Sequence, residues 1–173
     1  GIVISEGVRV IAEKSADSTV KIFQTDRYGL PEEIAESSPV LMDLLAYMQV
    51  NASIETFCHL PIGSGYGMSA AALLGTVHAL NALYDFHLSP RECARIAHRI
   101  EVQHQSGLGD ISACQGGGFV IRKTPGPDGD IMRVIDTRPI YALTISPIKT
   151  SSVLSSHDMI ALITQSFPSR IPQ

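Results

Sequence analysis

A glycine-rich segment that leads into an apolar stretch constrains the fold of this chain more than any other feature. Residues 61–71 read P-I-G-S-G-Y-G-M-S-A-A, and apolar side chains recur from there to Leu83. Glycine permits positive backbone φ angles and leaves no Cβ in the way of a bound anion. A helix that begins there would direct unpaired N–H groups and the positive end of its dipole at that anion. The pattern predicts a phosphate-binding turn between a strand and a buried helix.

Two common phosphate-binding patterns do not fit this segment. A Walker loop needs Lys followed by Ser or Thr after its last glycine, whereas Met68 and Ser69 follow Gly67. A dinucleotide fingerprint needs a third glycine where Met68 stands. The sequence also holds no G-x-S-x-G elbow of a serine hydrolase and no histidine spacing such as H-E-x-x-H. A phosphate cradle and a purely structural turn both stay open for the segment on its own.

Composition limits the class of protein. The chain has 173 residues, which suits one domain or one domain and part of another. With 45% hydrophobic and 17% charged residues, it can bury a core. The net charge of -4 and the lack of a long basic run argue against nucleic acid and anionic membranes as partners. We find no apolar run of about 18 residues and no signal-peptide pattern, so we expect a soluble, cytoplasmic protein. Three widely spaced cysteines, Cys58, Cys93 and Cys114, are typical of buried thiols.

The rest of the pattern predicts strands and helices in mixed order. β-Branched runs separated by turns indicate antiparallel strands over 2–4, 8–11 and 19–23. Ser38 and Pro39 indicate the start of a helix that runs to about Val50, and a capping box from Ser89 to Glu92 opens another. The other expected elements are strands over 53–59, 119–122, 131–135 and 141–145, and helices over 69–83 and from about His157.

Two acidic residues lie downstream of the glycine-rich segment. Glu101 falls at the edge of the buried stripe of its helix, away from three arginines that we expect to face solvent. Asp110 ends a second glycine turn, G-L-G-D, that we expect to open a short helix. Phosphoryl transfer needs a phosphate cradle, Mg²⁺ ligands and a group that engages the accepting hydroxyl. Residues 63–69 with Glu101 and Asp110 would supply all three. The alternatives are that Glu101 pairs with a lysine or arginine, and that Asp110 or Ser69 is a helix N-cap.

These segments resemble the GHMP kinases. Residues 61–71 are similar to the central motif of that superfamily, P-x-G-x-G-L-G-S-S-A-A. Glu101 and Val102, the segment G-L-G-D-I-S-A over 107–113, and K-T-S-S-V-L-S over 149–155 are most similar to archaeal pantoate kinases within it. The resemblance runs across most of the chain. It implies ATP-dependent and Mg²⁺-dependent phosphorylation of the primary hydroxyl of pantoate, which gives 4-phosphopantoate for coenzyme A biosynthesis.

The resemblance also implies roles for individual residues. Ser69 and Glu101 would bind Mg²⁺, and Asp110 would act as the base or orienting group toward the substrate hydroxyl, with Glu101 as the second catalytic residue. Met68 departs from the motif, because the family has a serine there. The expected ATP-binding residues are Pro61, Gly63, Ser64, Gly65, Tyr66, Gly67, Met68 and Ser69. Candidates for the carboxylate of pantoate are Arg99, Arg122 and Lys149, and the sequence selects none of them.

The implied fold is α+β. Residues 1–138 would form the ATP-binding domain of a GHMP kinase, similar to domain 2 of ribosomal protein S5 but without its first strands. Residues 139–173 would begin a ferredoxin-like C-terminal domain. Two family motifs are expected outside the chain, P-x-x-x-x-L-x-G-x-H/D before residue 1 and a glycine-rich motif after Gln173. The alternatives are a mevalonate or homoserine kinase, and a non-catalytic nucleotide-binding homologue. The oligomeric state, a homodimer included, stays open.

Overall fold

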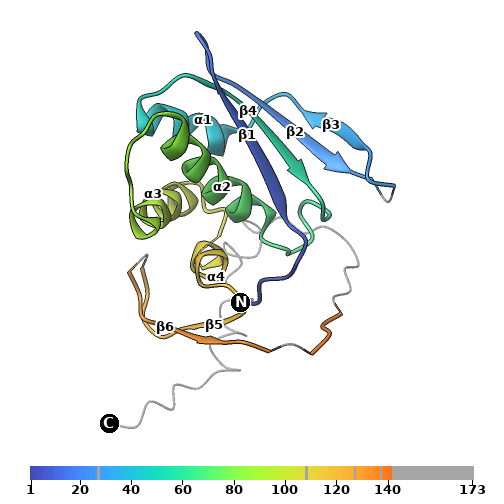
Figure 1. The fold of residues 1–173 in the computed structure, drawn as a ribbon, viewed down its shortest axis with the longest axis vertical. Helices are drawn as coiled ribbons and strands as arrows, with labels where there is room; N and C mark the ends of the chain where they lie inside the picture. Colours follow the sequence, from blue (N-terminus) through green and yellow to red (C-terminus); the bar gives the residue numbers. More distant parts are fainter. Residues whose placement is uncertain (27, 108, 127, 137, 142–173) are drawn as a thin grey trace.

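The computed structural model describes residues 1–141 except 27, 108, 127 and 137. The elements are β1 (Val8–Lys14), β2 (Thr19–Thr25), β3 (Pro31–Ala35), α1 (Pro39–Met48), β4 (Ala52–Cys58), α2 (Met68–Leu83), α3 (Pro90–Gln103), α4 (Asp110–Gly116), β5 (Phe119–Arg122) and β6 (Ile131–Val134). Figure 1 shows a four-stranded sheet with α1, α2 and α3 on one side, and the β5–β6 hairpin beyond α4. This is the α+β arrangement that the sequence predicts. Within the described part of the chain, no helix is both long and apolar enough to cross a membrane.

β4 lies inside the four-stranded sheet and separates β1 from β2. The strand order is β1-β4-β2-β3. β4 pairs antiparallel with β1, where Val8 lies opposite Cys58, and parallel with β2, where Val20 lies opposite Ile54. The prediction of a simple antiparallel series is therefore wrong in its pairing, although β1 and β2 do run in opposite directions. Two parallel strands need a crossover connection. The segment that contains β3 and α1 supplies it between β2 and β4.

The hydrophobic core lies between the sheet and the three helices. Side chains of β4 alternate between buried and partly exposed positions, as expected for a strand with one face on the core. α2 runs through the middle of the core, in agreement with its largely apolar sequence. The largest fully buried apolar side chains are Val20 of β2, Leu44 and Leu45 of α1, Ile54 of β4, Leu73, Val77 and Leu80 of α2, Ile100 of α3 and Ile111 of α4.

Two predicted helix starts, at Ser38 and at Ser89, are confirmed in their capping contacts. The hydroxyl oxygen of Ser38 accepts a hydrogen bond from the backbone N–H of Leu41 at 3.4 Å, and Pro39 follows as the first residue of α1. In α3, Glu92 Oε2 accepts from the backbone N–H of Ser89 at 2.8 Å, and Ser89 Oγ accepts from the backbone N–H of Glu92 at 3.3 Å. Both caps are set by neighbours in the sequence, which is why the sequence alone predicts them.

Three predicted elements differ from the structure or lie outside it. Residues 2–4 do not form a strand, because Ile2 makes an isolated bridge with Phe119 and the flanking residues stay exposed. β3 was not predicted, since it is a short edge strand with a proline at its first position and two glutamates. The strand over 141–145 and the helix from about His157 fall almost entirely outside the described residues. So does most of the segment 139–173, which we expect to begin a second domain.

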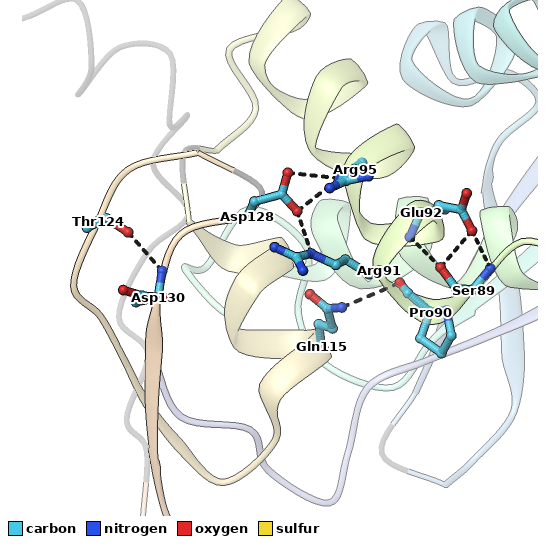
Figure 2. A network of polar contacts seen from close by, with 9 residues as sticks. All are labelled: Ser89, Pro90, Arg91, Glu92, Arg95, Gln115, Thr124, Asp128 and Asp130. Atoms are coloured by element: carbon cyan, nitrogen blue, oxygen red, sulfur yellow. Dashed lines mark hydrogen bonds and ion pairs between the residues drawn. The ribbon is translucent and has the colours of Figure 1, made fainter.

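An ion-pair cluster holds the β5–β6 hairpin against α3 (Figure 2). Asp128, in the turn of the hairpin, accepts from Arg91 Nε at 2.7 Å and from Arg95 Nε at 2.8 Å. Nearby, Gln115 of α4 donates to the carbonyl of Pro90 at 3.4 Å. The arginines of α3 do lie on its exposed face, as predicted, but two of them fasten the hairpin to the helix.

Candidate active site

The glycine loop between β4 and α2 has the backbone conformation that the sequence predicts. Gly63, Gly65 and Gly67 have φ angles of 76°, 81° and 65°, in the left-handed region that favours glycine. Gly67 is the N-cap of α2, and no side chain of the described residues caps that helix. The first N–H groups of α2 therefore face the loop without a side-chain acceptor, which is the arrangement that binds anions. Ser69 is the second residue of the helix, so its interpretation as an N-cap is wrong.

Asp110 lies directly against the N-terminus of α2. A Cβ placed on Gly67 would lie 3.6 Å from Asp110 Cγ and 3.7 Å from its Oδ2. Asp110 is the first residue of α4 and its side chain is exposed, while Gly109 is the N-cap. The interpretation of Asp110 as a helix N-cap is therefore wrong. The fold brings an exposed carboxylate next to the glycine loop, although the two are far apart in the sequence.

Glu101 is a fully buried carboxylate on the last turn of α3. Its exposed fraction is 0%, and its Oε2 lies 3.0 Å from Nδ1 of His98, one turn earlier. Its Oε1 has no hydrogen-bond partner among the described residues. Burial raises the pKa of Glu101, and the charge of Asp110 raises it further, while the His98 hydrogen bond and the charge of Arg122 lower it. The alternative that Glu101 pairs with a lysine or an arginine is not what the described residues show. The side chain at hydrogen-bond distance from Glu101 is His98.

The two carboxylates converge on Gly107. A Cβ on Gly107 would lie 2.5 Å from Glu101 Oε1 and 3.3 Å from Asp110 Oδ2. Backbone contacts also fix this turn, because the backbone N–H of Ser106 donates to the carbonyl of Glu101 at 3.1 Å. Gly107, in the turn between α3 and α4, thus lies beside the buried carboxylate of Glu101 and the exposed carboxylate of Asp110.

Arg122 of β5 lies on the same side of the molecule as these carboxylates. Its Nη2 would lie 3.5 Å from a Cβ on Gly109, the residue before Asp110. Arg99 instead stacks over the ring of Tyr47, with its Cζ 5.1 Å from the ring centroid. Lys149, the third candidate for a substrate carboxylate, lies outside the described residues. Of the two candidates that can be placed, Arg122 is the one near the acidic pair.

Two hollows meet at the start of α2. The larger is an open cleft of about 1040 Å³, lined by the N-terminal segment, the loop residues Ser64–Met68, and Asp110 and Cys114 of α4. The smaller, of about 160 Å³, lies toward the sheet and is lined by residues that include Leu41, Cys58, Ile62 and Ser69. Met68 is buried and lines both hollows. Asp110 therefore faces the larger hollow and Ser69 the smaller, and Glu101 lines neither.

The acidic pair has the chemistry of a partial Mg²⁺ site. The described residues contain no group of three or more His, Cys, Asp and Glu side chains that could hold a metal by themselves. Mg²⁺ is often bound by one or two carboxylates together with substrate phosphates and water. The buried Oε1 of Glu101, which lacks a hydrogen-bond partner in the described part of the chain, fits this use.

Sequence reasoning missed two polar residues of this region. His98 contacts Glu101 at a spacing of three residues on one helix face, a signal that the sequence does contain. Gln24 of β2 bonds to the backbone at the entry to the glycine loop. No local pattern indicates that contact, because it depends on β2 and β4 pairing in parallel.

Comparison with known proteins agrees with this arrangement. The profile described as "GHMP kinases N terminal domain" matches residues 34–118, which include the glycine loop, Glu101 and Asp110. The chain is also 99% identical over 173 residues to the pantoate kinase of Methanospirillum hungatei, which covers all of this chain and 60% of that protein. The chain belongs to the GHMP kinases.

More distant GHMP kinases match in sequence and in structure. The mevalonate kinase of Thermococcus sibiricus is 26% identical over 151 residues, which cover 84% of this chain and 42% of that protein. A solved structure described as a phosphotransferase related to the CoA biosynthesis pathway superposes with a TM-score of 0.57 and 26% identity, over 77% of this chain and 46% of that one. This chain therefore spans between about two fifths and three fifths of the length of these three relatives.

Proposed function

We propose that the complete protein transfers the γ-phosphoryl group of ATP to the primary hydroxyl of pantoate, and so makes 4-phosphopantoate for coenzyme A biosynthesis. The observation that carries this proposal is the exposed carboxylate of Asp110, which lies against the N-terminus of α2 in an open cleft. The near-identity to a pantoate kinase favours pantoate over mevalonate or homoserine as the acceptor. Because the chain spans 60% of that relative, the activity is proposed for the whole protein.

ATP would bind across the start of α2. Its phosphates would lie over the loop from Gly63 to Ser69, where backbone N–H groups and the helix dipole favour negative charge. The smaller hollow would take the nucleobase, because apolar side chains such as Leu41 and Ile62 form much of its wall. The buried side chain of Met68 would then separate the base from the cleft that receives the acceptor alcohol.

Glu101 and Ser69 are the residues that we propose to hold Mg²⁺. Glu101 has a buried oxygen that lacks a partner among the described residues, and its carboxylate lies beside that of Asp110. A bound Mg²⁺ would offset the charge on the transferring phosphoryl group. His98 would hold Glu101 in place through the bond to its other oxygen, and would stabilise the ionised carboxylate that a metal requires.

Asp110 would act on the acceptor hydroxyl. Its carboxylate would accept a hydrogen bond from the primary hydroxyl of pantoate, direct the hydroxyl oxygen at the γ-phosphorus, and take up the proton as the new bond forms. Its exposed position in the cleft allows a substrate to reach it, whereas buried Glu101 is suited to a structural or metal-binding role. The two carboxylates would therefore have different tasks.

Arg122 is our choice for the group that binds the carboxylate of pantoate. A guanidinium can bind a carboxylate through two parallel hydrogen bonds, which would also fix the orientation of the hydroxyl at the other end of a small molecule. The guanidinium of Arg122 lies beside Gly109, next to Asp110.

We also propose that residues 1–138 form the ATP-binding domain, that 139–173 begin the C-terminal domain, and that the protein acts in the cytoplasm.

The test is a comparison of ATP consumption by the complete protein with pantoate, mevalonate and homoserine. Consumption that depends on pantoate, with 4-phosphopantoate as the product, supports the proposal. Turnover with mevalonate or homoserine alone would replace the substrate and keep the reaction. ATP binding without transfer to any of the three would favour a non-catalytic nucleotide-binding homologue, a reading that Met68 at a motif serine position keeps open.

A further inference from the structure

Gln24 bonds to the backbone on both sides of the entry to the glycine loop. It lies near the end of β2, opposite Cys58 of the parallel strand β4. Its Nε2 donates to the carbonyl of Cys58 at 2.9 Å and to the carbonyl of Leu60 at 3.2 Å. Its Oε1 accepts from the backbone N–H of Ile62 at 3.3 Å. One carboxamide thus connects the last residue of β4 to the backbone just before Gly63.

These bonds replace partners that the backbone loses where the chain leaves the sheet. β4 ends at Cys58, and among the described residues 60–62 have no strand pairing to take over their backbone hydrogen bonds. On the opposite side, the backbone N–H of His59 donates to the carbonyl of Gly7 at 3.0 Å. The loop entry is therefore held from β2 by a side chain and from the segment before β1 by a backbone bond.

The chemistry at this position requires a carboxamide. Glutamine carries two N–H donors and a carbonyl acceptor on one rigid group, and this position uses both functions. Glutamate could accept from Ile62 but could not donate to the two carbonyls, and its charge would face their oxygens. Methionine has nearly the same length, cannot donate, and is only a weak acceptor. Both substitutions would keep the volume of the side chain while they remove the donors.

We propose that Gln24 is a positioning residue for the nucleotide-binding loop. By fixing residues 58–62, it sets the direction in which Gly63–Ser69 present their N–H groups to the phosphates of ATP. Cys58 and Ile62 also line the smaller hollow, so a shift of the loop entry would disturb both parts of the nucleotide site. This inference rests on the proposed ATP site, but it does not depend on which alcohol accepts the phosphoryl group.

The experiment compares Gln24→Met and Gln24→Glu with the wild type, all in the complete protein. Three quantities are measured: the dissociation constant for Mg-ATP, kcat with the KM values for ATP and pantoate, and amide hydrogen exchange over residues 59–67. We expect both variants to weaken ATP binding about tenfold or more, the change that a loss of about 1.4 kcal/mol would give. kcat and the KM for pantoate should change less than about threefold, because Asp110 and Gly107 belong to a different turn. Exchange over 59–67 should become faster in both variants.

The matched control is Thr19→Val at the opposite end of the same strand pair. Thr19 Oγ1 donates to Ser53 Oγ at 3.1 Å, so the variant also removes a side-chain bond between β2 and β4. We expect its ATP affinity and its exchange over 59–67 to match the wild type. An equal loss in Thr19→Val, or unchanged affinity in Gln24→Met, would overturn the inference. If Gln24→Met does not fold, Gln24→Glu supplies the same comparison.

The measurements on the wild type distinguish a failure of this inference from a failure of the proposed function. A wild-type protein that binds ATP but does not phosphorylate pantoate would refute the proposed function alone, because ATP affinity and loop exchange still decide the role of Gln24. A wild-type protein that binds no ATP would overturn both.

Discussion

The carboxylates of Glu101 and Asp110 reach the same glycine from opposite environments. Glu101 is fully buried and approaches the Cβ position of Gly107 to 2.5 Å, while exposed Asp110 approaches it to 3.3 Å. Two like charges this close are unfavourable unless a cation or a proton lies between or beside them. Burial is the main cause of the raised pKa of Glu101, and the charge of Asp110 raises that pKa further.

The first prediction concerns Gly107. In Gly107→Ala the new methyl group would collide with Oε1 at the end of the buried Glu101 side chain and force that carboxylate to shift. We expect the protein to fold with a loss of about 1–3 kcal/mol in the free energy of unfolding. We expect turnover of ATP with pantoate to fall about 100-fold, because displaced catalytic groups lose their alignment. Chemical denaturation and steady-state kinetics measure the two effects.

The matched control for Gly107 is Gly7→Ala. No atom lies within 4 Å of a Cβ on Gly7, and its φ angle is outside the left-handed region. We expect its turnover and stability to remain close to those of the wild type. Normal turnover in Gly107→Ala would show that the position of Glu101 is not important for the reaction.

The second prediction concerns the reactivity of Cys114, which lines the cleft. Burial raises the pKa of this thiol to about 11, with further contributions from the charges of Asp110 and Glu101. At pH 8 the thiolate fraction should then be about one in a thousand, so alkylation by iodoacetamide should be slow. Asp110→Asn should lower this pKa and speed alkylation at Cys114, while fully buried Cys93 stays unreactive. Site-resolved mass spectrometry measures the rates, and fast labelling of the wild type would contradict the expectation.

The third prediction concerns the ion pairs that Asp128 forms with Arg91 and Arg95 of α3. Hydrogen bonds from Arg95 and Arg91 hold the pKa of Asp128 below its ordinary value. A carboxyl with a lowered pKa stabilises the fold above its unfolded pKa, and the contribution is lost as the pH falls through the lower folded value. Asp128→Asn should therefore speed amide exchange in β5 and β6 at neutral pH, and this effect should shrink progressively below about pH 4, as the pH falls through the lowered folded pKa of Asp128. Equal exchange in the variant and the wild type at neutral pH would show that these ion pairs do not hold the β5–β6 hairpin against α3.

The parts of the fold that the sequence predicts are those that neighbouring residues determine. The left-handed glycines of the loop and the caps at Ser38 and Ser89 depend on a few adjacent residues. The central position of α2 follows from a helix that is apolar on nearly every side. The order of the sheet could not be predicted in this way, because β4 pairs with two strands that lie more than 25 residues earlier in the chain.

The candidate site, too, can be predicted from the sequence only in part. Asp110 and Glu101 could be identified because their segments resemble those of a known family, but their meeting at Gly107 is a property of the turn between α3 and α4. The burial of Glu101 is complete, whereas the helix pattern placed it only at the edge of the buried stripe. The contact between Gln24 and the loop entry depends on the register of two parallel strands, which no local pattern indicates.

The most direct test of the account is the effect of Asp110→Asn on the complete protein, with product formation from ATP and pantoate followed by ³¹P NMR and Mg-ATP binding followed by calorimetry. We expect the wild type to form 4-phosphopantoate. We expect the variant to lose at least about 100-fold in kcat, as removal of a group that takes up a proton commonly does, while it binds Mg-ATP nearly as well as the wild type. Wild-type turnover in the variant would remove Asp110 from its catalytic role, and absence of pantoate phosphorylation by the wild type would contradict the proposed function.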